Sequence, residues 1–173
     1  MACNLTAGIS KGCRDNAGGI VEVYLANYPT GYTAQEWYTE TTGEVTSISG
    51  LTGAMYKFEP NKNSSSWVEN IQSSVENGTI GYSQELTMVF AKNQASTLNT
   101  IKLLGQANMI AIVRNKNEKY FMLGAQDGVE LSAGNSASGA ALNDLNGWTI
   151  TLSGMEPYPA YEVSSSIISA LLA

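Results

Sequence analysis

The chain has 173 residues, of which 43% are hydrophobic and 14% are charged, and its formal net charge is −6. This balance is typical of a packed globular protein and excludes a disordered chain, which has fewer apolar residues and a higher charge. The length predicts a single domain over residues 1–173 that buries roughly two-thirds of the surface of the unfolded chain.

The charged residues are unevenly distributed along the chain. Lys119 is the last basic residue, and only acidic residues follow it, namely Asp127, Glu130, Asp144, Glu156 and Glu162. Tight binding of nucleic acid requires clustered lysine and arginine, so the composition excludes a DNA-binding module. An acidic surface can still line a passage through which DNA slides without sticking. We therefore expect genomic DNA to be at most a passing contact that is not tightly bound.

Targeting and membrane segments are also not expected. The N-terminal sequence MACNLTAGISKGC has no apolar core and reaches a lysine at position 11, so it does not predict a signal peptide. No apolar run approaches the ~20 residues of a transmembrane helix. We expect a protein that is made and used in soluble form, with no membrane partner.

The first third of the chain predicts three strands. Residues 8–19 (GISKGCRDNAGG) are turn-rich and predict an extended or loose segment. Residues 19–28 (GIVEVYLANY) are dense in β-branched and aromatic residues, which favour a strand. After a looser stretch, residues 44–49 and 54–60 predict two strands around a turn at 50–53.

The longest β feature is a hairpin over residues 65–91, with a turn at Asn77-Gly78. Both arms are longer than the usual strand of ~5–6 residues, so the hairpin is expected to project past its own core and pair with another molecule. On the second arm one face is formed by Ile80, Tyr82, Leu86, Met88 and Phe90. On the first arm one face is formed by Trp67, Ile71 and Val75.

One helix is predicted over residues 92–104. Apolar residues recur there at intervals of three, and Gly105 is a natural stop. The apolar stripe is narrow, which predicts a helix lying on one face of a sheet.

The last third predicts a second hairpin, a loop and two further segments. Residues 108–126 form strands around the turn NKNE, and residues 128–139 predict a Gly/Ala/Ser loop. Residues 147–157 (GWTITLSGMEP) alternate cleanly as a strand. The tail, residues 160–173, is expected to start extended and to end as a short strand or an apolar turn.

These elements sum to eight or nine strands and one helix. Consecutive hairpins dominate, so the sheets should be mostly antiparallel. The fold class predicted is mainly β (α+β), an antiparallel β-sandwich or partly closed barrel with one flanking α-helix and a long hairpin.

The search for catalytic chemistry is mostly negative. The chain has no histidine, which removes the usual general base of serine and cysteine hydrolases and the commonest zinc ligand. It contains no phosphate-binding or dinucleotide-binding glycine motif. Two carboxylate pairs, Glu36/Glu40 and Asp127/Glu130, resemble the acid pair of glycosidases, but solvated surface acids explain them better. We expect no enzyme activity, no catalytic residue, no cofactor and no metal site.

The two cysteines, Cys3 and Cys13, fit no common zinc-ligand spacing. Two free thiols in a reducing cytoplasm are favoured over a disulfide. Neither possibility assigns these residues a functional role.

The remaining features favour self-association. Exposed strand edges are a liability for a monomer but a means of assembly for an oligomer, and pairing of backbones between copies requires no special side chains. The long hairpin therefore predicts an oligomer interface formed by Trp67, Ile71, Val75, Ile80, Tyr82, Gln84 and Leu86.

Four segments carry a family resemblance: MACNLTAGISKGCRDNAGGI, SVENGTIGYSQELTMVF, KYFMLGAQDGVELSAG and DLNGWTITLSGMEPYPAYEV. They resemble small virion structural proteins of phages that infect Bacteroidetes-type bacteria, whose general plan is similar to that of phage tail tube proteins. The resemblance covers nearly the whole chain and rests on overall pattern rather than on a catalytic motif.

The resemblance implies a β-sandwich or barrel with one flanking helix that assembles into rings, hexameric in that family, which stack into a tube. In such proteins a long hairpin helps to line the lumen, for which residues 65–91 are the candidate here. Loops and termini join successive rings, for which residues 127–140 are a candidate. It also implies other virion tail or neck proteins as partners, and a location in the virion tail after assembly in the host cytoplasm.

Two alternatives stay open from the sequence. The first is a ring or adaptor protein at the neck or portal of a phage, which forms a single ring that does not stack. The second is a carbohydrate-binding β-domain that uses tryptophan and paired carboxylates and remains a monomer.

Overall fold

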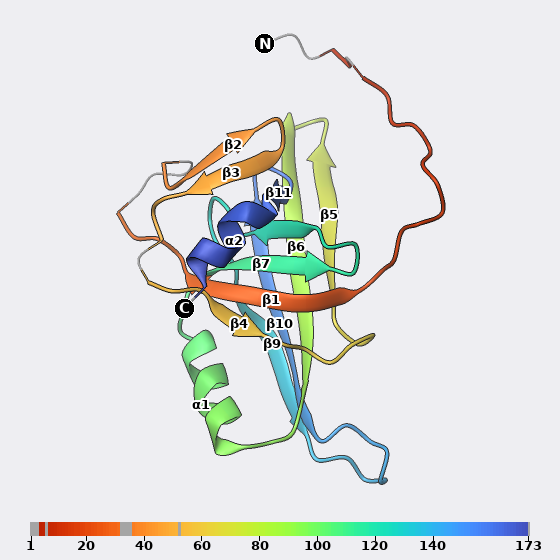
Figure 1. Cartoon of the computed structure of the whole chain (residues 1–173), viewed down its shortest axis with the longest axis vertical. Coiled ribbons are helices and arrows are strands. Elements are labelled where there is room, and N and C mark those ends of the chain that lie inside the picture. The colour runs from red at the N-terminus through yellow and green to blue at the C-terminus, as the bar shows by residue number, and fades with distance from the viewer. Residues whose placement is uncertain (1–3, 6, 32–35, 52, 173) are drawn as a thin grey trace.

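The computed structural model describes residues 4–5, 7–31, 36–51 and 53–172, which form eleven strands and two helices (Figure 1). The strands are β1 (Ile20–Asn27), β2 (Tyr38–Thr41), β3 (Glu44–Ile48), β4 (Tyr56–Phe58), β5 (Ser66–Ser74), β6 (Thr79–Ala91), β7 (Met109–Asn115), β8 (Tyr120–Leu123), β9 (Glu130–Ala137), β10 (Gly147–Glu156) and β11 (Tyr161–Val163). The helices are α1 (Ala95–Leu104) and α2 (Ser165–Leu171).

The strands form two sheets that are not closed into a barrel. The seven-stranded sheet has the order β2-β3-β11-β8-β7-β1-β4, and the four-stranded sheet has the order β5-β6-β10-β9. All pairs are antiparallel except β3 with β11, which is parallel. The predicted mainly β sandwich with a long hairpin is confirmed.

The main core lies between the two sheets. From the four-stranded sheet it receives Leu86 and Met88 of β6 and Ile150 and Leu152 of β10, all at most 1% exposed. The residues that face them from the seven-stranded sheet, of which Val23 is one, lie on the inward side of β1 and β7. The alternation of apolar and polar residues along β6 and β10 follows from burial of only one face of their sheet.

A second core covers the other face of the seven-stranded sheet. Ile110 and Ile112 of β7 pack there with Trp37, which is 0% exposed, and with Ile168 of α2. Strand β7 is therefore buried on both faces, which explains why it is an almost continuous apolar run (MIAIVRN) rather than an alternating one. This layer closes off one side of the seven-stranded sheet.

The long hairpin of β5 and β6 is confirmed. The two strands pair in register from Ser66 opposite Thr87 to Ser74 opposite Thr79. The turn is where the Asn77-Gly78 signal predicts it, and Gly78 has a φ of 63°, a conformation that glycine adopts without strain.

The predicted helix over residues 92–104 is confirmed as α1, which begins three residues later than expected. Gly105 ends the helix, and its backbone N–H donates to the carbonyl oxygen of Ile101 at 3.0 Å. Leu104 is buried and Ile101 is half-buried against the main core. The helix therefore closes one end of the gap between the two sheets, through the narrow apolar stripe seen in the sequence.

The prediction that two strands pair around a turn at residues 50–53 is wrong, because the two strands do not pair with each other. β3 and β4 both exist, but β3 pairs with β2 and β11, whereas β4 pairs with β1 at the opposite edge of the seven-stranded sheet. The segment between them crosses the sheet, and Met55 is buried in the second core on the way. Burial of Met55 outweighs the local turn signal.

The Gly/Ala/Ser loop expected over residues 128–139 is also wrong, because residues 130–137 form β9. Glycine, alanine and serine have low strand propensity. Their backbone is held by antiparallel pairing with β10, from Gly147 opposite Ala137 to Ser153 opposite Glu130. The pairing partner, and not the composition, decides this element.

The tail differs as well. Residues 161–163 are extended as expected, but residues 165–171 form α2 and not a strand or turn. Ile168 lies on the buried side of α2 and is 3% exposed in the second core. The count of one helix and of eight or nine strands was therefore too low.

Candidate self-assembly surface

The outer face of the four-stranded sheet is a broad solvent-facing surface. Pairing places Leu86 opposite Leu152 toward the core, so the adjacent residues of each strand point away from it. The residues on this outer face include Val68, Asn70, Gln72, Ser83, Glu85, Thr87, Thr149, Thr151, Ser153 and Asn135. They are mostly hydroxyl and amide side chains, and the Oγ1 atoms of Thr87 and Thr151 lie 3.3 Å apart across two strands.

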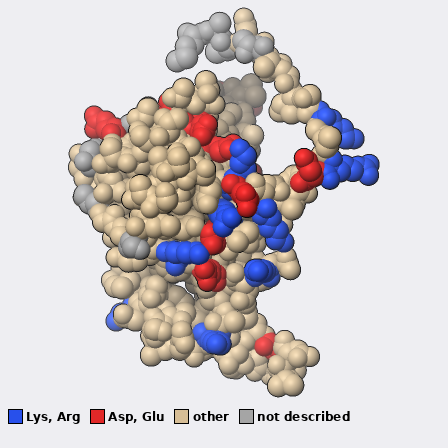
Figure 2. All heavy atoms as spheres, viewed as in Figure 1, with Lys and Arg blue, Asp and Glu red and all other residues tan. Residues whose placement is uncertain are grey.

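The four-stranded sheet contains no positive charge. Its strands carry four glutamates, Glu69, Glu85, Glu130 and Glu156, and no lysine or arginine. Glu85 and Glu130 lie on the outer face, each directly opposite Ser153 in its own strand pair. Basic residues instead gather with acidic ones near β1 and β7 and on the N-terminal segment (Figure 2).

Both edges of this sheet are open. In the part of the chain that the structure describes, β5 pairs only with β6 and β9 pairs only with β10. Successive strands of the sheet are antiparallel, so β5 and β9 run in opposite directions. An edge strand presents a row of free backbone N–H and C=O groups that can pair with another chain.

The structure places the seven predicted interface residues in three groups by exposure. Ile71, Val75 and Ile80 are 66%, 93% and 56% exposed and lie at the distal end of the hairpin, beyond the main core. Gln84 and Leu86 are instead 2% and 1% exposed inside the chain's own fold. The distal group is therefore accessible to a second molecule, whereas Gln84 and Leu86 are not.

The other two predicted interface residues lie between these extremes. Trp67 is half-buried, and its ring centroid is 5.4 Å from that of Phe121 on β8. Tyr82 is half-buried opposite Glu156 of β10. Whether any of the seven residues contacts another copy stays a prediction.

The predicted carboxylate pairs are not brought into a cavity. Glu36 and Glu40 are exposed, and Glu40 accepts a hydrogen bond from the backbone N–H of Gly43 in the β2–β3 turn. Asp127 and Glu130 are exposed too. Surface acids, the interpretation preferred from the sequence, describe these positions.

The carboxylate that is buried is Glu156, the last residue of β10, which the sequence analysis did not single out. It is 1% exposed. Its Oε2 accepts the backbone N–H of Gln126 at 2.9 Å, and its Oε1 accepts that of Asp127 at 3.0 Å. Burial raises the pKa of Glu156 to about 7, although these two hydrogen bonds oppose the increase. Both oxygens are occupied and shielded, so this carboxyl has no access to a substrate.

Glu156 belongs to a buried polar network. In the described part of the chain four polar residues are buried, and three of them, Gln84, Gln126 and Glu156, lie around the segment 124–128. Gln84 Oε1 accepts the backbone N–H of Gly124 at 2.9 Å, and Gln84 Nε2 donates to Glu69 Oε2 at 2.9 Å. The network ties the hairpin to the segment that links the two sheets.

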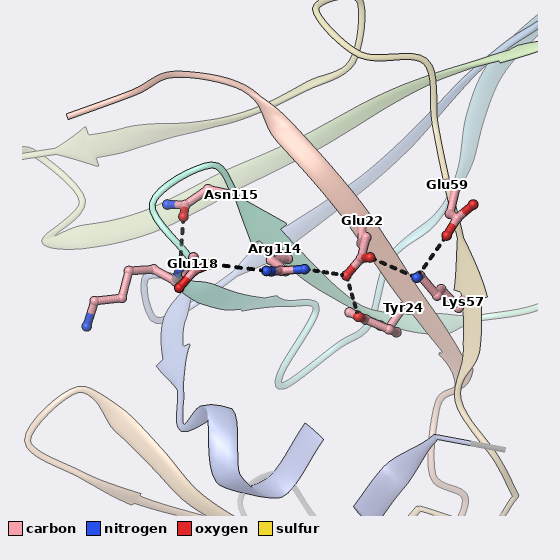
Figure 3. A network of polar contacts seen from close by, with 8 residues as sticks. Glu22, Tyr24, Lys57, Glu59, Arg114, Asn115 and Glu118 are labelled. Atoms are coloured by element: carbon pink, nitrogen blue, oxygen red, sulfur yellow. Dashed lines mark hydrogen bonds and ion pairs between the residues drawn. The ribbon is translucent and has the colours of Figure 1, made fainter. Parts of the chain in front are cut away.

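A second network lies on the seven-stranded sheet (Figure 3). Glu22 Oε1 is 2.7 Å from Lys57 Nζ, and Glu22 Oε2 is 3.0 Å from Arg114 Nη1 and accepts the Tyr24 hydroxyl at 2.7 Å. Burial disfavours ionisation of Glu22, but these hydrogen bonds outweigh it and lower the pKa of Glu22 to about 2. The network joins β1, β4 and β7, and it uses two of the chain's basic residues internally.

In the ranges that the structure describes, cysteine, metal and membrane features add no site. Cys13 is exposed with a free thiol, and Cys3 lies outside the described residues. Within the described ranges, no three His, Cys, Asp or Glu side chains are grouped so as to hold a metal ion. None of the described helices has the length and apolar character to cross a membrane.

Comparison with known proteins does not narrow the function. No family model matches the sequence, and neither a curated protein nor a solved structure matches it.

Proposed function

We propose that this chain is a non-enzymatic structural subunit that assembles into closed rings through the two edges of its four-stranded sheet. The rings stack into a tube through which DNA passes, as in a phage tail tube. The subunit is then a virion protein of the tail, which is assembled in the host cytoplasm together with other tail or neck proteins.

The observation that carries this proposal is the outer face of the four-stranded sheet. A conduit for DNA must be wide, polar and free of positive charge, because clustered lysine and arginine would bind the phosphates. The strands of this sheet contain no lysine or arginine, and Glu85 and Glu130 lie on its outer face. Such a surface repels the DNA backbone at short range.

The edge geometry supports ring closure. Because β5 and β9 run in opposite directions, rotating a copy about an axis roughly along the strands places its β9 antiparallel to the β5 of its neighbour. The same junction repeats at each step, so the interface is heterologous, and it gives a ring when the rotation between neighbouring copies closes. The outer faces of successive copies then form one continuous lining.

Projecting segments are available for contacts between stacked rings. The first part of the N-terminal segment stands away from the body before residues 16–19 bond to the β7–β8 turn, and the β9–β10 loop projects at the opposite end (Figure 1). Leu5 and Ile9 on the first segment are 95% and 104% exposed. Within the candidate region 127–140, β9 occupies residues 130–137, so we assign stacking to the loop 138–146 that follows it.

Electron microscopy of the purified protein at high concentration tests the proposal. Rings and tubes are the expected particles. Persistently monomeric particles, both alone and with partner tail proteins, would refute it. A single ring that does not stack would instead favour an adaptor at the neck or portal, and the copy number per virion separates the two, because a tube needs many rings.

A pair of proline variants tests the edge itself. Along an edge strand the backbone N–H groups point alternately to the neighbouring strand and to the free side. Asn135→Pro and Ser136→Pro on β9 therefore remove one N–H of each kind. We expect one variant to lose intrachain pairing and thermal stability, and the other to keep its stability but fail to assemble. Normal tubes from the stable variant would exclude β9 as the ring interface.

The carbohydrate-binding alternative has weaker support. Sugar-stacking requires exposed aromatic rings, whereas Trp37 is 0% exposed and both Trp67 and Trp148 are half-buried. A saccharide-dependent change in tryptophan fluorescence of a stable monomer would be the result that favours it.

A further inference from the structure

An apolar groove lies between helix α1 and the edge strand β4. Its volume is about 520 Å³, within the ~300–1,000 Å³ typical of cavities that take up a ligand. Two of its side chains, Tyr56 and Leu103, are 62% and 60% exposed, so the groove leaves apolar surface in contact with water. Contiguous apolar surface of this kind marks an interaction site. The hydrophobic residues that line the groove include Leu25, Tyr56, Phe58, Leu103, Leu104 and Met109.

The strand that borders the groove is a free sheet edge. Within the described residues β4 pairs only with β1, and the backbone of the residue before β4 is bonded to the end of α2. Tyr56 and Phe58 both line the groove, whereas Lys57 between them points to the opposite face and contacts Glu22. A chain that pairs with this edge would therefore place every second side chain in the groove.

The N-terminal arm, residues 4–5 and 7–15, has the matching pattern. Every one of these residues is exposed, and the exposed fractions of Leu5 and Ile9 are 95% and 104%. In an extended chain Leu5, Ala7 and Ile9 lie on one side, over about 13 Å at about 3.3 Å per residue. This alternation has the same period of two as the side chains of β4 that face the groove.

The position of the arm points to a groove on a second copy. Residues 16–19 are bonded to the β7–β8 turn beside the start of β1, whereas the groove lies toward the other end of β1, beside Leu25. From this anchor the arm leads away from α1, toward the opposite end of the long axis of the molecule (Figure 1). A neighbour displaced along that axis meets the arm with the end that carries α1.

We propose that the N-terminal arm of one copy pairs with the β4 edge of a second copy and buries Leu5, Ala7 and Ile9 in the apolar groove. Main-chain hydrogen bonds to the edge supply affinity, and the alternate apolar side chains set the register. The arm and the groove are different surfaces, so the contact is heterologous, and each copy gives one arm and receives another. The contact itself needs only two copies, whereas its place between stacked rings rests on the proposed function.

Photo-crosslinking of the full-length protein tests this contact. The photoreactive amino acid p-benzoylphenylalanine replaces Ile9, and this chain is mixed with an excess of nitrogen-15-labelled wild type at the concentration used for electron microscopy. We expect products of two chains in which the arm is joined to labelled peptides of β4 or α1. Absence of such products, cross-links within one chain, or cross-links to another surface such as β5 or β9 would overturn the proposal.

Two leucines of α1 give matched variants of the labelled partner. Leu103→Glu places a charge in the groove and should lower the yield of the two-chain product at least about tenfold, because an apolar site disfavours an unpaired charge. Leu98 is 54% exposed on the same helix but does not line the groove, so Leu98→Glu should retain the yield. Both positions are exposed, so both variants should keep the melting temperature of the wild type. Equal yields from the two variants would contradict the groove as the receptor.

The outcomes also separate this inference from the proposed function. Cross-links to β4 or α1 without rings or tubes would leave the arm contact standing and refute the tube. Tubes whose cross-links avoid β4 and α1 would support the tube and refute the arm contact.

Discussion

Glu22 of β1 and Arg114 of β7 lie side by side across two hydrogen-bonded strands, with Oε2 and Nη1 3.0 Å apart (Figure 3). Lys57 of β4 contacts the other oxygen of the same carboxylate. One carboxylate thus links three adjacent strands at the edge of the seven-stranded sheet. The fold stabilises the ionised form of the Glu22 carboxylate. Protonation of this group at low pH should therefore destabilise the folded state.

We predict that Glu22 makes the fold sensitive to acid. Its pKa is lowered to about 2 from an ordinary value of 4.5, so the folded state binds fewer protons than the unfolded state between these values. Its contribution to the free energy of unfolding is present above pH 4.5 and is lost as the pH falls toward 2. Thermal unfolding at several pH values should show this loss, and Glu22→Gln should weaken it. An identical acid profile in Glu22→Gln would contradict the prediction.

Glu156 should act in the opposite direction. Its pKa in the fold is raised to about 7, so the folded state binds more protons than the unfolded state between pH 4.5 and 7. Its contribution is present below pH 4.5 and is lost as the pH rises through 7. In Glu156→Gln the decline in melting temperature between pH 5 and 8 should be smaller than in the wild type. A steeper decline in the variant would refute this assignment.

Substitutions of two isoleucines distinguish an effect on folding from an effect on assembly. Ile150 is 0% exposed in the main core, so Ile150→Ala should lower the free energy of unfolding by about 2–5 kcal/mol. Ile80 is 56% exposed on the distal hairpin, so Ile80→Ala should change it by less than about 0.5 kcal/mol. If the distal hairpin contacts another copy, Ile80→Ala should still impair assembly, as measured by sedimentation. Normal assembly of Ile80→Ala would remove this residue from the interface.

Reversing charge on the outer face should create DNA binding. Glu85→Lys combined with Glu130→Lys gives the four-stranded sheet two cations per subunit where it has none. Assembled rings of this variant should bind short duplex DNA at least about tenfold more tightly at low salt, and should release it as the salt concentration rises. Fluorescence anisotropy measures this binding. Glu40→Lys with Glu44→Lys, which changes the charge equally on the β2–β3 hairpin, is the control and should bind less.

Close strand packing makes Gly147 intolerant of a side chain. A Cβ atom there would lie 2.0 Å from the carbonyl oxygen of Phe90, which belongs to the paired backbone of β6 and cannot rotate away. Gly147→Ala should therefore lower the free energy of unfolding by about 1–3 kcal/mol. Gly134 of β9 is the matched control, since its Cβ would meet Ile150 at 3.4 Å, an ordinary contact. Equal stability of the two variants in urea unfolding would contradict the packing argument.

Sequence periodicity predicted β6 and β10 correctly, because only one face of each of these strands is buried. The alternation in β6 and β10 predicted strands with one buried face, and Leu86, Met88, Ile150 and Leu152 are buried as that pattern requires. The turn at Asn77-Gly78 and the end of α1 at Gly105 were predicted because glycine signals are local. Strand β9 was missed because its residues carry no local strand signal.

The sequence alone determined strands β1, β5, β6 and β10, the helix α1 and the absence of any cation after Lys119. These properties depend on residue type and on neighbours in the chain. Only the tertiary structure decided that β3 and β4 lie far apart and that, among the residues it describes, β5 and β9 are open edges and Glu156 is buried without a counter-ion. Each of these depends on contacts between segments distant in the chain, and solvent exclusion and strand pairing arise only from such contacts.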